Sequence, residues 1–333
     1  MNRRVCLGLM VALGAATLAP LETAAQTVTL RMVGSWAPGF SPSADVGHKF
    51  KDLVNQHGAG KVAIRYIGAE DVVPPFDQPE ALVNGVFDVW YGAPNYWAGV
   101  VPGGDITELS PFLAPDGGPG SALHQFMVKL YERRGVRFLG HAAGDLGVGT
   151  HYITTRKRVA RIEDLKGMKI RVAPVTRHFV QAAGAESITL PPAEIFLAMD
   201  RGTVDGFSWP VADAFTRYGW QNVSKFLIDQ PMYRSGVSIV VNQRAWSRLS
   251  KEAQDVLMRA VAETQTWTRG WFAENLDKQK AAMRAAGMEI VTLSEADRDR
   301  WTKVANEALW KYYEGVMPKD VFAEAATLLE RNR

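Results

Sequence analysis

Segments with strand-like and helix-like hydrophobic patterns alternate along this chain of 333 residues from about residue 27 onward. The first strands are expected at residues 27–33, 61–67 and 87–91, with helices at 43–57 and 77–85 between them. A strand, helix, strand order with short connections favours a parallel sheet with right-handed crossovers. The chain is therefore expected to be an α/β protein.

A second α/β unit is expected to start near Gly149. Its strands are predicted at residues 151–155, 169–173, 187–190 and 204–209, with helices near 176–183 and 193–201. The chain then returns to strand at residues 238–242. A length of 333 residues also suggests two domains rather than one.

One long helix is expected from about Ser250 to Ala286. Ser250 is a suitable N-cap, and only Gly270 interrupts the run of helix-forming residues. Thirty-odd residues correspond to roughly 50 Å of helix, which is longer than one small domain covers. A strand at residues 289–292 and two helices, the first capped at Ser294, are expected to complete the chain.

The first residues have the pattern of a secretory signal peptide, assigned to residues 1–25. Arg3 and Arg4 precede an apolar run, and Ala24 and Ala25 offer small side chains for cleavage. Cys6 is the only cysteine and leaves with this segment, so the mature protein has neither a disulfide nor a thiol nucleophile. No second apolar run approaches the roughly 20 residues of a membrane helix.

Composition and motifs give little support to nucleic-acid binding or catalysis. The formal net charge is +3, and no basic block is interleaved with aromatic residues. The sequence lacks a His-x-x-x-His zinc pattern, a Gly-x-Ser-x-Gly elbow and a Gly-x-x-x-x-Gly-Lys phosphate loop. We therefore expect no cofactor, metal ion or nucleic-acid partner, although catalytic groups need not be local in sequence.

An arginine inside a predicted strand is the most informative single residue. Arg171 follows the turn Glu163–Gly167 in the strand Lys169-Ile170-Arg171-Val172. A guanidinium does not lose its charge and must be paired where it is covered. Arg171 therefore either points to water, forms an internal ion pair or binds an anion.

Two motifs of this region resemble the substrate-binding proteins of the TRAP (tripartite ATP-independent periplasmic) transporters. They are Lys166-Gly167-Met168-Lys169-Ile170-Arg171-Val172 and the run from Phe196 to Gly206, which ends in Gly-x-Val-Asp-Gly. The resemblance implies a two-domain periplasmic-binding-protein-like fold with a hinged cleft and a long domain-spanning helix. It also implies that Arg171 binds the ligand's carboxylate and that the partners are one small and one large integral membrane subunit.

Strand ends supply the other candidate site residues, because ligands of open α/β sheets collect beyond the carboxyl ends of the strands. His151 offers a donor and an acceptor near neutral pH, and the aromatic candidates would form flat walls suited to an apolar or aromatic body. Strand alternation means that Trp90 and Tyr91 cannot both face the cleft. The predicted substrate-binding set is Arg171, Trp209, His151, Ser208, Trp36, Tyr91, Tyr96, Phe207 and Arg234.

The segment Ser208-Trp209 bears on whether a metal ion bridges the ligand. The keto-acid branch of the resembled family reads Glu-Trp here, and its second metal-binding glutamate falls near Tyr233-Arg234. Both carboxylates are missing from this chain, and hard cations prefer several charged oxygen ligands. A metal-bridged ligand is therefore not expected, and Arg234 is either a replacement for the cation's charge or a surface arginine.

The sequence thus predicts a periplasmic receptor for a small organic acid. Domain I is expected at residues 26–148 plus about 235–275, and domain II at 149–234 plus about 276–333. Three alternatives stay open: a sensor subunit that presents the ligand to a signalling protein, a secreted hydrolase or lyase on the same scaffold, and a ligand-free surface protein.

Overall fold

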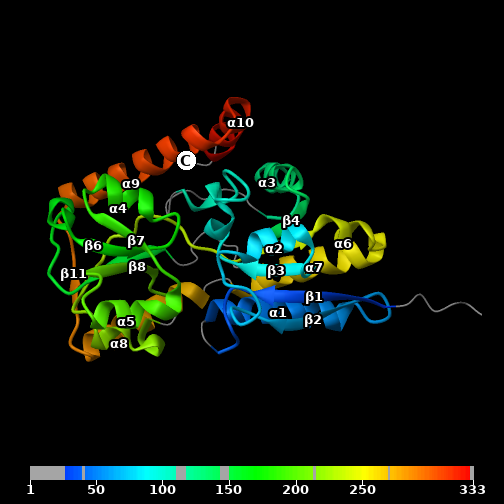
Figure 1. Cartoon of the computed structure of the whole chain (residues 1–333), viewed down its shortest axis with the longest axis horizontal. Coiled ribbons are helices and arrows are strands. Elements are labelled where there is room, and N and C mark those ends of the chain that lie inside the picture. The colour runs from blue at the N-terminus through cyan, green and yellow to red at the C-terminus, as the bar shows by residue number, and fades with distance from the viewer. Residues whose placement is uncertain are drawn as a thin grey trace, which may run out of the picture.

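The computed structural model describes residues 27–39, 42–109, 118–142, 150–212, 215–268 and 271–330. The predicted signal peptide lies outside these ranges. Two lobes, each built on one sheet, lie side by side (Figure 1). The prediction of a two-lobed α/β fold is confirmed.

The sheet of the first lobe has the strand order β2-β1-β3-β10-β4. Its strands are β1 (Val28–Gly34), β2 (Val62–Gly68), β3 (Val89–Gly92), β4 (Val136–His141) and β10 (Ser238–Asn242). β1 pairs in parallel with β2 and β3, as expected, but β10 is antiparallel to both β3 and β4. The expected parallel pairing of the first three strands is confirmed, and β10, which returns from the other lobe, enters this sheet in the opposite direction.

The sheet of the second lobe has the strand order β11-β9-β5-β8-β6-β7. Its strands are β5 (His151–Thr155), β6 (Lys169–Val172), β7 (Glu186–Thr189), β8 (Gly206–Pro210), β9 (Phe226–Ile228) and β11 (Glu289–Val291). β5 is antiparallel to its neighbours β8 and β9, whereas β6 is parallel to β7 and β8. Every residue of β5 and β8 is buried, as in a sheet covered on both faces.

Helices cover both sheets, and short 3₁₀ turns join several strands to them. The α-helices are α1 (Pro42–His57), α2 (Gln78–Asn84), α3 (Ala122–Glu132), α4 (Arg177–Ala182), α5 (Ile195–Asp200), α6 (Gln243–Ser247), α7 (Lys251–Thr268), α8 (Trp271–Ala285), α9 (Glu295–Val316) and α10 (Lys319–Glu330). The 3₁₀ helices are η1 (Pro94–Trp97), η2 (Ile106–Glu108), η3 (Ile162–Leu165), η4 (Pro192–Glu194), η5 (Phe215–Tyr218) and η6 (Trp220–Asn222).

The predicted long helix from about Ser250 to Ala286 corresponds to α7 and α8. Residues 269 and 270, between the two helices, lie outside the described ranges. α7 packs against α1 and β4 of the first lobe, and α8 contacts β11 of the second lobe. The helical segment therefore passes from one lobe to the other, as expected.

A second helix also joins the lobes, which the sequence did not predict. α9 crosses the top of the molecule from the second lobe toward α10 and α3 (Figure 1). Its Trp301 packs against Phe179 of α4, and its Tyr313 lies beside Asp105 of the first lobe. Ser294 caps α9 as expected, accepting a bond from the N–H of Asp297. α10 packs against α3 of the first lobe, although residues 276–333 were expected to belong with domain II.

The described residues next to β4 and β5 pair with the segment between β9 and β10, which leads from the second lobe to the first. The N–H of Ala142 donates to the carbonyl of Val237 at 2.7 Å, and the N–H of His151 donates to the carbonyl of Tyr233 at 2.9 Å. Residues 142 and 151 are therefore held beside residues 232–237, which lie between the sheets.

A buried carboxyl group lies where α9 meets the first lobe. Asp105, just before η2, is fully buried, and burial raises its pKa from 3.8 to about 7. The Tyr313 hydroxyl faces Asp105 and offsets part of this rise in pKa. Neither the carboxyl oxygens of Asp105 nor the Tyr313 hydroxyl makes a hydrogen bond of normal geometry within the described residues. The surroundings of Asp105, where α9 meets the first lobe, therefore favour its protonated form.

We expect Asp105 to make a contribution to the free energy of unfolding that falls as the pH rises from about 4 to 7. Folded Asp105 keeps its proton up to about pH 7, whereas the unfolded side chain loses it near 4, so the folded state binds more protons in this window. The variant Asp105→Asn removes this contribution, so the slope of the unfolding free energy against pH should become more positive than in wild type by up to about 1.4 kcal/mol per pH unit. Urea unfolding followed by tryptophan fluorescence measures the slope.

The variant Asp299→Asn, at an exposed position of α9, serves as the control and should keep the wild-type slope. An Asp105→Asn protein with the same pH dependence as wild type would show that Asp105 is not protonated in the folded state.

Candidate functional site

A cavity lies between the two sheets and receives side chains from both lobes. The first lobe contributes residues that follow β1 and β3, and the second contributes residues of β5, β6 and β8. The lining residues are Trp36, Ser43, Ala93, Asn95, Tyr96, His151, Arg171, Ala173, Trp209, Pro210 and Ser235. The free volume of this cavity is about 20 Å³, which is space for roughly one or two water molecules.

The antiparallel direction of β5 explains how its first residue reaches the cavity. His151 pairs with Pro210, the last residue of β8. The start of β5 and the carboxyl end of β8 therefore lie at the same edge of the sheet. In the same way Ser238, the first residue of β10, pairs with Gly92 at the end of β3. The ligand-facing edge thus contains the starts of antiparallel strands as well as the ends of parallel ones.

Arg171 is 1% exposed and is bound only by backbone carbonyls. Its Nε and Nη2 donate to the carbonyl of Leu190 at 2.9 and 2.6 Å, and its Nη1 donates to the carbonyl of Ser208 at 3.2 Å. Within the described ranges no carboxylate lies at ion-pair distance from this guanidinium. The exposed carboxylate of Glu194 acts on it only through the longer-range field.

The unused donors of Arg171 lie on both of its Nη atoms. A guanidinium has five N–H donors, and the three bonds to carbonyls leave one N–H on each Nη atom. Two parallel N–H groups match the two oxygens of a carboxylate. Burial lowers the pKa of Arg171 to about 10, so the group stays charged at neutral pH. The cavity therefore contains a cation without an acidic partner in the described structure.

His151 is a neutral imidazole with both ring nitrogens available. It is 3% exposed, and neither Nδ1 nor Nε2 has a hydrogen-bond partner among the described residues. Burial, together with the charge of Arg171, lowers its pKa to about 3. Neutral imidazole offers one donor and one acceptor, so His151 can bind a hydroxyl or a carboxylate without adding charge.

Aromatic rings form the walls of the cavity. Trp209 lies against Arg171, with 5.7 Å between the guanidinium carbon and the ring centroid, and it packs edge-on against Trp220. On the opposite lobe, Tyr96 packs against Trp36 with ring centroids 6.3 Å apart. Three of the predicted aromatic residues thus line the cavity, and their rings leave little free space between the lobes.

Two other predicted aromatic residues do not line the cavity. The Tyr91 ring is buried beside Gly34 and Gly47, where a Cβ atom would collide with it, and its hydroxyl donates to the carbonyl of Trp36 at 2.9 Å. Phe207 is packed in the second lobe's core against Trp220. Both predictions of ligand contact are corrected: Tyr91 supports the chain at Trp36, and Phe207 belongs to the core.

Ser208 and Arg234 are also outside the lining. The Ser208 hydroxyl bonds to the Thr176 hydroxyl at 2.6 Å, and only its carbonyl participates, by accepting from Arg171. Arg234 is buried in the segment between β9 and β10, and its N–H donates to the carbonyl of Glu108. Arg234 is therefore not a surface arginine, and the cavity is lined by its neighbour Ser235 instead.

Sequence reasoning missed the small and amide side chains of the lining. Asn95 lies in η1 beside the predicted site residue Tyr96, but it was not singled out. Ser43 begins the helical region after β1, and Ser235 lies in the crossing segment. Position after a strand was the available signal for Asn95, whereas nothing in the local sequence marks Ser235.

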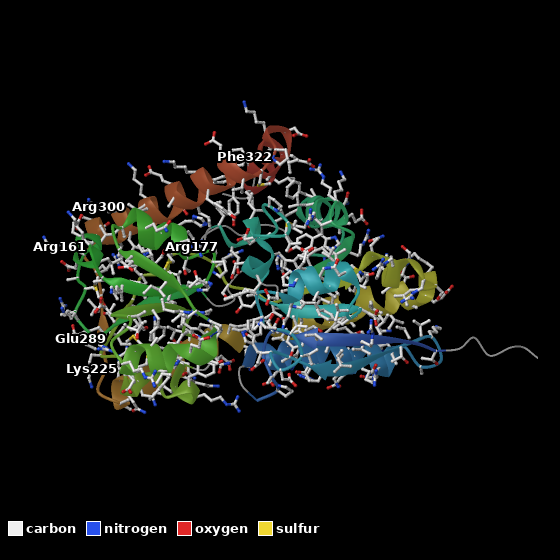
Figure 2. The ribbon with its side chains drawn as sticks, viewed as in Figure 1. Arg161, Arg177, Lys225, Glu289, Arg300 and Phe322 are labelled. Atoms are coloured by element: carbon white, nitrogen blue, oxygen red, sulfur yellow. The ribbon has the colours of Figure 1, made fainter. Side chains whose placement is uncertain are left out.

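No group of three or more His, Cys, Asp or Glu side chains is arranged to hold a metal ion within the residues that the structure describes. In the same residues, no helix is both long and apolar enough to cross a membrane. The labelled charged residues Arg161 and Arg300 lie at the outer edge of the second lobe (Figure 2).

Solved structures of solute-binding proteins share this fold. The solved structure of a TRAP periplasmic solute binding protein from Desulfovibrio salexigens with bound orotic acid is 18% identical, covers 92% of this chain and 100% of its own, and has a TM-score of 0.79. A TRAP periplasmic solute binding protein from Ralstonia eutropha with bound (S)-2-acetolactate is 23% identical, covers 91% and 99%, and has a TM-score of 0.77.

The 2,3-diketo-L-gulonate-binding periplasmic protein of Escherichia coli is 26% identical over 298 residues, which are 85% of this chain and 84% of the relative. The fold and cavity define a two-lobed periplasmic-type binding protein. Residues 33–315 match the model of the bacterial extracellular solute-binding proteins, family 7, and the chain belongs to that family. The predicted family, receptor class and extracytoplasmic location are therefore confirmed.

We expect a chelator to leave ligand affinity unchanged. Ser208 occupies the position of the expected metal-binding glutamate, and its hydroxyl is turned to Thr176. Titration of the purified protein with a binding organic acid, with and without excess EDTA, measures this. A loss of affinity that added Ca²⁺ or Mg²⁺ restores would show that a cation bridges the ligand.

Proposed function

We propose that this protein is the solute receptor of a TRAP transporter and captures a small organic acid through its carboxylate. Arg171 supplies the charged anchor, and His151 binds a second polar atom. Trp209, Trp36 and Tyr96 enclose the body of the ligand. Residues from both lobes contact the ligand together, so binding stabilises the closed arrangement of the lobes.

The observation that carries this proposal is the state of Arg171. A buried cation without a counter-charge costs several kcal/mol, and a bound anion offsets that cost. The guanidinium lies in the cavity wall with one N–H on each Nη left by its carbonyl bonds. A carboxylate is the planar, two-oxygen anion that this pair of donors matches.

Relatives support the assignment to organic acids. A TRAP protein from Sulfurospirillum deleyianum was solved with bound succinate, and the DctP protein of Rhodobacter capsulatus is named a C4-dicarboxylate-binding periplasmic protein. These ligands belong to those proteins. By the same relationship we propose that the closed receptor delivers its ligand to one small and one large membrane subunit, and that it binds without chemical turnover.

The small free volume bears on how the ligand enters. Trp36, Arg171 and Trp209 are each no more than 5% exposed. A ligand in the cavity would therefore be cut off from solvent, and the lobes must separate to admit it. Residues 232–237 and the helical segment α7–α8 are the natural positions for that motion.

We expect the variant Arg171→Met to lose carboxylate binding by at least about 100-fold, because the ligand's carboxylate would be buried without a partner. Arg171→Lys should retain part of the affinity, since an ammonium cannot donate two parallel bonds. Isothermal titration calorimetry with the tightest acid from a thermal-shift screen measures the effect.

The matched control is Arg177→Met, which changes an exposed arginine of α4 that bonds to Thr189. It should bind as wild type does. Without ligand, Arg171→Met should still unfold in one cooperative thermal transition, because removal of the unpaired buried charge offsets part of the loss of the bonds to Leu190 and Ser208. A folded Arg171→Met protein with unchanged affinity would refute the anchor role. Consumption of the acid by the wild-type protein would instead show that it is an enzyme.

A further inference from the structure

The side-chain oxygen of Asn95 is an unused hydrogen-bond acceptor in the cavity wall. Asn95 is 1% exposed, and its Oδ1 is buried without a partner among the described residues. A buried acceptor that lacks a donor costs about 1–3 kcal/mol. A ligand that places an O–H or N–H against this oxygen would recover that free energy.

Glu108 determines which end of the Asn95 amide faces the cavity. The Nδ2 of Asn95 donates to the Glu108 carboxyl, at 3.0 Å to Oε2 and 3.3 Å to Oε1. Glu108 lies in η2, is 1% exposed and does not line the cavity. With Nδ2 held by Glu108, Oδ1 is the end of the amide that is left for a ligand.

Glu108 keeps this role whether or not it carries a proton. Burial and the neighbouring Asp105 raise the pKa of Glu108 well above its ordinary value, and the N–H of Gly236 points at the same carboxyl. A protonated carboxyl still has one oxygen that can only accept. Nδ2 of Asn95 can therefore donate to Glu108 in both states.

The charges around the cavity distinguish a hydroxyl from an ammonium as the donor. The described lining contains no Asp or Glu side chain, and Arg171 already places a cation in the same space. An ammonium would lack a counter-ion and would be repelled by the guanidinium. A neutral hydroxyl has one donor for Asn95 Oδ1 and two lone pairs for donors such as the unpartnered Nε1 of Trp36.

We propose that Glu108 is a specificity-determining positioning residue that orients the Asn95 amide to select a hydroxy carboxylate over the matching keto carboxylate. A keto oxygen only accepts and would face the acceptor Oδ1, which leaves both unpaired. This inference rests on the proposed carboxylate-binding function and adds the class of the ligand's second polar group.

The test compares matched acids of equal carbon number by calorimetry. The probes are lactate, pyruvate and propionate, then 2-hydroxybutyrate, 2-oxobutyrate and butyrate, then malate and succinate, with both enantiomers of each hydroxy acid. Wild type should prefer the hydroxy acid over its keto and unsubstituted counterparts by about tenfold or more. Equal affinity within a series, or a preference for the keto acid, would overturn the inference while leaving carboxylate binding intact.

The variant Glu108→Gln tests the orienting role. The Gln oxygen would still accept from the N–H of Gly236, and its NH₂ group would then face Asn95 and turn the amide so that Nδ2 points into the cavity. The ratio of hydroxy-acid to keto-acid affinity should fall about tenfold or reverse, with the affinity for propionate or butyrate unchanged. A folded Glu108→Gln protein with the wild-type ratio would contradict the proposal.

Two further variants cover the case in which Glu108→Gln does not fold. Asn95→Ala removes the acceptor and should abolish the preference for hydroxy over unsubstituted acids. Asp105→Asn removes a neighbouring buried carboxyl that does not bond to Asn95, and it should keep the wild-type ratio. Failure of every acid to bind wild type would instead refute the proposed function itself.

Discussion

The rest of the site depends on one permanently charged guanidinium held in a closed cavity by carbonyl groups alone. Arg171 cannot release its proton at neutral pH, so its charge must be compensated by dipoles or by an anion. The carbonyls of Leu190 and Ser208 supply the dipoles and fix the plane of the group. The same positive charge, with burial, keeps His151 neutral. Because no described acidic side chain pairs with Arg171, a bound anionic ligand would be its counter-ion.

The first lobe adds neutral polar groups to the cavity wall, and residues outside the lining fix the orientation of these groups. Tyr91 holds the carbonyl of Trp36, and Glu108 holds the amide of Asn95. Glu108 also accepts, through its backbone carbonyl, the N–H of Arg234 in the segment between the lobes. The groups that orient the ligand-facing atoms are therefore coupled to the connection on which the lobes would hinge. In this proposal the charge comes from the second lobe, and the first lobe supplies the choice between a hydroxy and a keto acid.

The sequence could predict the parts of this arrangement that are local. Hydrophobic periodicity placed most strands within one or two residues, and β5 and β10 matched their predicted ranges. The chemistry of a strand arginine led to Arg171. The sequence could not show the direction in which β10 enters the first sheet, because pairing between distant segments leaves no local signal. It also could not separate Tyr91, which is buried under α1, from Tyr96, which lines the cavity.

The most direct test is a crystal structure of the protein bound to the acid for which it has the highest affinity. The account predicts two carboxylate oxygens bonded to Nη1 and Nη2 of Arg171, which keep their bonds to the carbonyls of Leu190 and Ser208. It also predicts a ligand hydroxyl donating to Oδ1 of Asn95. A ligand bound elsewhere, or an Arg171 that turns away to an internal carboxylate while the cavity is filled, would contradict it.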